Sequence, residues 1–271
     1  MRVGIVGLGL IGGSLGMALK ASGWAEVFAF DADPSVRARA GEMFGACDSA
    51  GDLAASVDLL VLAAPPSVNL LLLSSLAPIL HAGAVMTDVG SVKGQISALG
   101  HAVLPERFVP SHPMAGSEKH GLSAARADLF HGATWAVTPL AENRPDAVEL
   151  VEKLVRAVGA TPLQMTPEAH DRAVAVTSHA PHVLAYALSA LAKEREASGE
   201  PISQLAAGGF HSATRVAASS PALWAQICLA NRANVLDALA DFRAALDEMT
   251  LALASGDAAA LESALAKGHR G

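Results

Sequence analysis

The chain has 271 residues, which exceeds the usual size of one domain and predicts two domains with separate cores. Hydrophobic residues make up 52% of the sequence and aromatic residues only 4%, so Ala, Leu and Val must build the core, as is typical of helix-rich α/β proteins. With 19 basic against 26 acidic residues, a net charge of -7 and no block of Lys or Arg, the chain is not suited to bind nucleic acid. Cys47 and Cys228 lie far apart, which argues against a disulfide framework and favours a reducing cytoplasm.

Two uncharged stretches have compositions that resemble membrane segments. Residues 3–19 resemble the apolar part of a signal peptide, but their many glycines suit a tight phosphate-binding turn better. Residues 59–87 are long enough to span a bilayer, yet Pro65, Pro66 and Pro78 divide them into a strand, a short helix and a second strand. We therefore expect a phosphate-binding turn at the first stretch, buried sheet at the second, and no membrane contact at either.

The first part of the chain alternates apolar runs with amphipathic helical patterns. Strands are expected at residues 2–6, 26–30, 57–63, 84–87, 108–110 and 134–138, with helices between the first four. A helix at 145–158 and a strand at 161–165 are expected to complete the sheet. This order predicts a parallel, doubly wound sheet in an N-terminal domain of residues 1–165.

After residue 165 the strand signals stop, and helices rich in Ala and Leu follow. Thr166 is expected to cap a helix that begins at Pro167. We therefore expect an all-helical domain over residues 166–271. A helical half so rich in Ala often packs against a second copy of itself, so we expect a homodimer.

A glycine-rich turn, Gly7-Leu8-Gly9-Leu10-Ile11-Gly12, joins the first strand to the first helix, as a dinucleotide fingerprint requires. Gly7 permits the tight turn, Gly9 lets a pyrophosphate approach the backbone, and Gly12 lets helix and strand pack closely. Asp31 ends the second strand, where it can accept hydrogen bonds from a ribose and repel a 2′-phosphate, or merely cap the next helix. The pattern predicts a Rossmann-type domain that binds NAD. The expected cofactor-binding residues are Gly7, Gly9, Leu10, Ile11, Gly12 and Asp31.

Two polar segments follow later strands, at the sheet edge where chemistry gathers in open α/β folds. They are DVGSVK at residues 88–93 and SHPMAGSE at residues 111–118. Each places polar side chains beside small residues, at the position where a nicotinamide ring would lie. A lone histidine in a loop is more often structural than catalytic, so His112 gains weight only in combination with other motifs.

Five motifs together resemble those of the prephenate and arogenate dehydrogenase family. They are GLGLIGGS at 7–14, DVGSVK at 88–93, HPMAGSE at 112–118, TSHAPH at 177–182 and TRVAASSPALW at 214–224. The likeness covers nearly the whole chain in the expected order, and HPMAGSE and SHxPH are far more specific than the glycine fingerprint. It implies NAD-dependent oxidative decarboxylation of prephenate or arogenate, on the route to tyrosine.

The implied reaction assigns roles to two residues. Hydride leaves C4 of the substrate ring for NAD, and the ring carboxylate departs as carbon dioxide. The 4-hydroxyl group then needs a base, a task that suits a neutral imidazole. The resemblance makes His112 this base and implies that Ser91 hydrogen-bonds the same hydroxyl, the nicotinamide or both.

The substrate carries two carboxylates, so the site needs a fixed cation. Arg215 is the best candidate, because a guanidinium binds a carboxylate at two points. Lys93 fits a substrate contact and a solvated surface position equally well. The resemblance also implies that Glu118 and Trp224 lie near the entrance, with Trp224 reaching toward substrate from a partner subunit.

His179 and His182 lie three residues apart on an expected helix, so they share one face. This spacing could suit a metal, but no acidic neighbour completes a motif such as HExxH, and we expect no metal. The resemblance instead places Ser178, His179 and His182 in the active-site wall, with His182 the better substrate contact. Pro181 is expected to kink the helix between the two histidines.

One segment departs from the family's pattern, and two other functions stay open. Many relatives carry an Asp after a glycine pair, whereas this chain reads GGFHS at 208–212, so an ionic gate between that Asp and Glu118 cannot form. A β-hydroxyacid dehydrogenase shares the two-domain plan but relies on a Lys in its helical half, where only Lys193 and Lys267 occur. A non-catalytic NAD-binding sensor would keep the fold without the chemistry.

Overall fold

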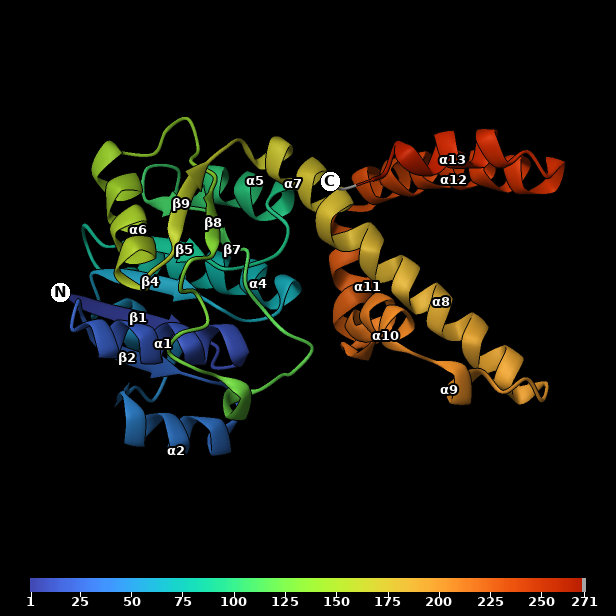
Figure 1. Ribbon diagram of the computed structural model, residues 1–271. Coiled ribbons are helices and arrows are strands. Elements are labelled where there is room, and N and C mark those ends of the chain that lie inside the picture. Colours follow the sequence, from blue (N-terminus) through green and yellow to red (C-terminus); the bar gives the residue numbers. More distant parts are fainter. Residues whose placement is uncertain (270–271) are drawn as a thin grey trace.

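The computed structural model describes residues 1–269, with an α/β part followed by an all-helical part (Figure 1). The main elements of the α/β part are β1 (Arg2–Val6), α1 (Leu10–Ser22), β2 (Glu26–Phe30), α2 (Pro34–Met43), β3 (Gly45–Ala46), α3 (Ala50–Ala54), β4 (Leu59–Leu62), α4 (Pro66–Leu76), β5 (Val85–Asp88), α5 (Gly94–Val103), β6 (Phe108–Val109), β7 (Ser111–Pro113), β8 (Thr134–Val137), α6 (Pro145–Ala157) and β9 (Thr161–Gln164).

The main sheet is parallel, with strand order β3-β2-β1-β4-β5-β6. One hydrophobic core joins α1 and α6 to the sheet, and a second core joins α3, α4 and α5 to it. Because helices cover both faces, every residue of β4 is buried. This confirms the predicted doubly wound fold. The order reverses between β1 and β4, and the carboxyl ends of the strands at that point form the usual ligand site.

The last three strands form a sheet of their own, which corrects the expectation that they complete the main sheet. β7 pairs antiparallel with β8, and β8 pairs parallel with β9. Pro110 lies between β6 and β7 and has no N–H with which to continue the main ladder. Its carbonyl instead accepts the backbone N–H of Thr138, just after β8. His112 therefore lies on a strand, not in a loop.

The helical part begins as predicted, because the Thr166 hydroxyl accepts the N–H of Ala169 at 3.1 Å and caps α7. A π-helical turn over Ala175–His179 leads directly into α8, and Pro181 lies in the first turn of α8. The helices are α7 (Pro167–Val174), α8 (Ala180–Ala197), α9 (Ile202–Leu205), α10 (Gly208–Thr214), α11 (Pro221–Ala230), α12 (Arg232–Ser255) and α13 (Ala258–Ala266).

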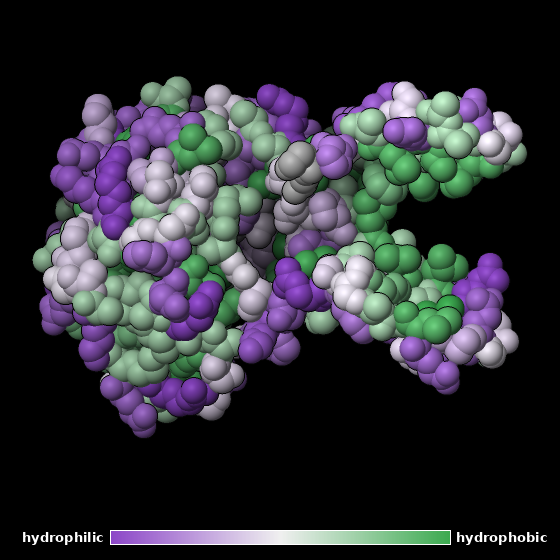
Figure 2. Space-filling view, in the orientation of Figure 1, coloured by the Kyte–Doolittle hydropathy of each residue, from purple (hydrophilic) through white to green (hydrophobic). Residues whose placement is uncertain are grey.

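The helical part has two arms, one formed by α8 to α10 and the other by α12 and α13 (Figure 1). Hydrophobic residues gather on the facing sides of these arms (Figure 2). Leu205 on α9 is 77% exposed and Leu251 on α12 is 72% exposed. Within residues 1–269, no helix is both long enough and apolar enough to cross a bilayer.

Candidate active site

The glycine turn between β1 and α1 has the shape that a dinucleotide requires. Gly7 has a φ of 97°, and a Cβ there would lie 2.7 Å from a backbone oxygen after β4. A Cβ on Gly12 would collide with the carbonyl oxygen of Gly7, whereas a Cβ on Gly9 would meet no atom within 4 Å. Leu10 and Ile11 open α1, so their backbone N–H groups have no partner within the helix. The turn thus fits a bound pyrophosphate.

Asp31 directly follows β2, lies beside this turn and accepts two backbone hydrogen bonds. The N–H of Leu8 donates to Oδ2 at 2.7 Å, and the N–H of Asp33 donates to Oδ1 at 2.9 Å. The helix cap that we considered for Asp31 belongs to Asp33, whose carboxylate accepts the N–H groups of Ser35 and Val36. Asp31 therefore places a carboxylate directly against the glycine turn, as ribose recognition would require.

Lys93 is fully buried, so the surface position considered for it is wrong. Its Nζ lies 2.5 Å from Oδ2 of Asp88 and donates to the carbonyl of Ser111 at 2.7 Å. Burial lowers the pKa of Lys93, and the neighbouring Asp88 carboxylate partly opposes this. Asp88 ends β5 and Ser111 begins β7, so the Lys93 ammonium joins the two strands next to His112.

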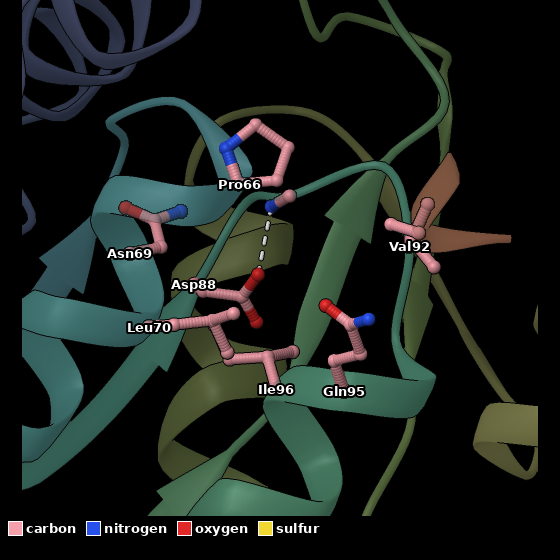
Figure 3. Close-up of a pocket in the computed structure, with 9 residues that line it drawn as sticks. Pro66, Asn69, Leu70, Asp88, Val92, Gln95 and Ile96 are labelled. Carbon is pink, nitrogen blue, oxygen red and sulfur yellow. Dashed lines mark hydrogen bonds between the residues drawn. The ribbon is translucent and has the colours of Figure 1, made fainter. Parts of the chain in front are cut away.

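A small recess lies at the carboxyl ends of β4 and β5 (Figure 3). It is lined by residues that include Pro66, Asp88, Gly90 and Val92, with Ala230 of α11 on its helical side. The Asp88 carboxylate accepts the N–H of Gly90 at 2.8 Å, which fixes the loop that follows β5. Ser91 lies between two of these lining residues and is partly buried. The loop after β5 and the end of α11 therefore meet at this recess, next to Ser91 in the chain.

His112 is partly buried on β7 and faces a second histidine that the sequence analysis missed. Its Nδ1 lies 2.9 Å from Nε2 of His170 on α7, and Nδ1 of His170 lies 2.8 Å from Oδ1 of Asp171. The Asp171 carboxylate also accepts the backbone N–H groups of Lys93 and Gly94, each at 2.8 Å. Burial and the neighbouring His170 hold the pKa of His112 well below its ordinary value, so its imidazole is neutral near pH 7. No hydrogen bond joins His112 to Ser91 among the described residues.

His182 and Trp224 of the same chain form a stacked pair. Their ring centroids are 3.4 Å apart and the planes differ by 19°. The Nδ1 of His182 lies 2.8 Å from the carbonyl oxygen of Ser178, to which it donates. Nε2 of His182 is then left as an acceptor.

His179 is buried beside this pair. The side-chain amide of Asn231, which the sequence analysis missed, donates to Nδ1 of His179 at 3.1 Å. Nε2 therefore carries the hydrogen, and this atom is buried without a partner. Burial lowers the pKa of His179 to about 4, so the ring is neutral. Within residues 1–269, no group of three or more potential ligand side chains could hold a metal ion.

Arg215 and Glu118 form an ion pair at the edge of the site. Nη1 of Arg215 donates to Oε2 of Glu118 at 2.7 Å, and the two side chains are 61% and 30% exposed. Ser212, where the family resemblance led us to look for an Asp, is exposed on α10. Glu118 thus pairs with Arg215, the arginine that we expect to bind a substrate carboxylate.

Both parts of the chain are similar to known proteins. Residues 15–163 match the prephenate dehydrogenase nucleotide-binding domain, and residues 166–267 match the prephenate dehydrogenase dimerization domain. A cyclohexadienyl dehydrogenase from Zymomonas mobilis is 36% identical, over 94% of this chain and 89% of the relative. The solved prephenate dehydrogenase of Aquifex aeolicus, in complex with hydroxyphenyl propionate and NAD+, has a TM-score of 0.91 and 30% identity over 98% of this chain and 95% of that one. A Synechocystis arogenate dehydrogenase has a TM-score of 0.83 and 28% identity over 98% of this chain and 97% of that one. The chain belongs to the prephenate dehydrogenase family.

Proposed function

We propose that this protein is an NAD-dependent dehydrogenase that oxidises and decarboxylates prephenate, arogenate or both in tyrosine biosynthesis. The two family matches span the α/β part and the helical part, and the relatives are named for these reactions. The observation that carries the proposal is the neutral imidazole of His112, placed on β7 with one nitrogen engaged by His170.

NAD, when bound, accepts the hydride that leaves the substrate ring. Gly7, Gly9 and Gly12 make room for its pyrophosphate, and Leu10 and Ile11 offer the free N–H groups at the start of α1. The Asp31 carboxylate accepts hydrogen bonds from the adenosine ribose. The same charge disfavours the 2′-phosphate of NADP.

His112 acts as the general base. Its Nε2 takes the proton from the ring hydroxyl as that carbon becomes a carbonyl, and the low pKa of His112 keeps the ring neutral beforehand. Ser91 lies in the loop after β5 and hydrogen-bonds the same hydroxyl or the nicotinamide. The two side chains thereby align the reacting carbon with the cofactor.

Arg215 binds a substrate carboxylate at two points once Glu118 releases it. A group that holds the ring carboxylate too tightly as an anion would oppose its conversion to neutral carbon dioxide. Arg215 therefore contributes mainly to binding and orientation. The buried Nε2–H of His179, Nε2 of His182 and Ser178 complete the substrate-binding wall, and Trp224 fixes the plane of His182.

The functional unit that we propose is a homodimer in the cytoplasm, with domains at residues 1–165 and 166–271. The helical part matches a dimerization domain, and its two arms carry exposed leucines that a second copy would cover (Figure 2). Both cysteines are free, as a reducing compartment would keep them. Sedimentation analysis should give twice the mass of one chain.

The function is tested by following NADH formation with purified protein. Prephenate, arogenate and a set of small β-hydroxyacids are compared as substrates, each with NAD and with NADP. Prephenate or arogenate should give the highest kcat/KM, and it should be higher with NAD. Turnover of the β-hydroxyacids alone would favour that class of dehydrogenase, and NAD binding without any turnover would favour a sensor.

A further inference from the structure

A buried series of hydrogen bonds connects His112 to the helical part of the chain. Nδ1 of His112 lies 2.9 Å from Nε2 of His170, whose Nδ1 lies 2.8 Å from Asp171. His170 and Asp171 are both buried, so water does not compete for these contacts. His112 belongs to β7 and the other two residues belong to α7. The base on one domain is therefore held by a pair from the other.

The direction of each hydrogen bond follows from the last acceptor in the series. Burial tends to raise the pKa of Asp171, but hydrogen bonds from His170, Lys93 and Gly94 outweigh burial and lower it, so the carboxylate is ionised. An ionised carboxylate only accepts hydrogen bonds, which requires a hydrogen on Nδ1 of His170. When the His170 ring carries only this one hydrogen, its Nε2 accepts and Nδ1 of His112 donates. Nε2 of His112 keeps its lone pair.

We infer that His170 and Asp171 are positioning residues that hold His112 in the tautomer with a basic Nε2 and stabilise the charge that it gains. This inference rests on the proposed role of His112 as the base. During the reaction the hydroxyl proton moves to Nε2 of His112, which becomes a cation. Asp171 balances this charge through the intervening His170 ring, without contact between either residue and the substrate.

Two substitutions of similar size separate this role from simple packing. In His170→Gln, the amide reaches the position of the ring Nε2 and can still accept from Nδ1 of His112. In His170→Asn, the shorter amide can donate to Asp171 but leaves Nδ1 of His112 without its acceptor. Thermal midpoint and the Kd for NAD show whether each variant is folded. Steady-state kinetics then separate kcat from KM.

We expect kcat of His170→Asn to fall about 10- to 100-fold, as for outer partners that orient metal-bound histidines, with KM and the Kd for NAD within about threefold of the parent. His170→Gln should recover most of that loss. Equal kcat in the two variants, or parental kcat in His170→Asn, would overturn the inference. If neither variant folds, the tautomer of His112 in the unaltered protein tests the inference instead.

Nitrogen-15 NMR of the histidine-labelled protein with bound NAD reads that tautomer directly, with the His112 signals assigned from a His112→Asn spectrum. The inference requires hydrogen on Nδ1 and none on Nε2, and the opposite pattern contradicts it. The parent is first assayed with prephenate and arogenate. A parent without activity refutes the proposed function, whereas the NMR pattern still decides the positioning role.

Discussion

Replacing Lys93 with methionine distinguishes a structural ammonium from one that binds substrate. The Lys93 side chain is 0% exposed and its Nζ contacts Asp88 and the carbonyl of Ser111. Methionine keeps most of the side-chain volume but leaves the Asp88 carboxylate buried without its partner. Removing one member of a buried ion pair costs about 3–5 kcal/mol. At roughly 2–4 °C per kcal/mol for a domain of this size, the thermal midpoint should fall by about 6–20 °C.

The matched control is Lys153→Met on α6. The Lys153 side chain is 55% exposed and lies 2.9 Å from Glu149 in the same helix. Exposed pairs of this kind contribute about 0.3–0.5 kcal/mol, so the midpoint should move by about 2 °C or less. Differential scanning calorimetry of both variants, with NAD absent, measures the two shifts. If Lys93→Met melts like the control and only its KM for prephenate rises, Lys93 binds substrate and the structural account is wrong.

Three further predictions concern the cofactor, the base and the cation. Asp31→Ser should lower the ratio of kcat/KM with NAD to kcat/KM with NADP, because the carboxylate that repels the 2′-phosphate is gone. The Arg37 guanidinium, which donates to the carbonyl of residue 31 at 2.8 Å, remains nearby. An unchanged ratio would remove Asp31 from cofactor selection. The pH profile of kcat/KM should lose activity only well below pH 6.5, since His112 must be neutral to act and its pKa is lowered, and an acid limb at or above that value contradicts the assignment. Arg215→Ala should raise KM with little change in kcat, whereas a pure kcat defect would place Arg215 in the bond-breaking step.

The sequence predicted those parts of the site that depend on local backbone geometry. Gly7 has a positive φ, and Gly12 leaves no room for a Cβ, so their spacing alone reveals the cofactor turn. The cap at Thr166 depends on an N–H only three residues away and was also predictable. The sequence left two roles open for Asp31, a ribose contact and a helix cap. In the structure the cap is Asp33.

Contacts between distant segments could not be predicted. His170 and His112 are 58 residues apart, and no spacing pattern marks an adjacent His and Asp inside a helix as partners of a strand residue. Lys93 looked suitable for a surface because its burial depends on a carbonyl of β7, itself a strand too short to recognise. The separate sheet formed by β7 to β9 was not predicted either, because it depends on pairing between distant segments. Pro110 ends one ladder, but the sequence does not show which strand pairs next.

The central claim is that His112 takes a proton from the ring alcohol beside bound NAD. The most direct measurement compares the parent with His112→Asn for NADH formation, at saturating prephenate or arogenate, together with the Kd for NAD. The expected result is a loss of kcat of about 10²- to 10⁴-fold with an unchanged Kd for NAD. A His112→Asn enzyme that turns over at close to the parental rate would contradict it.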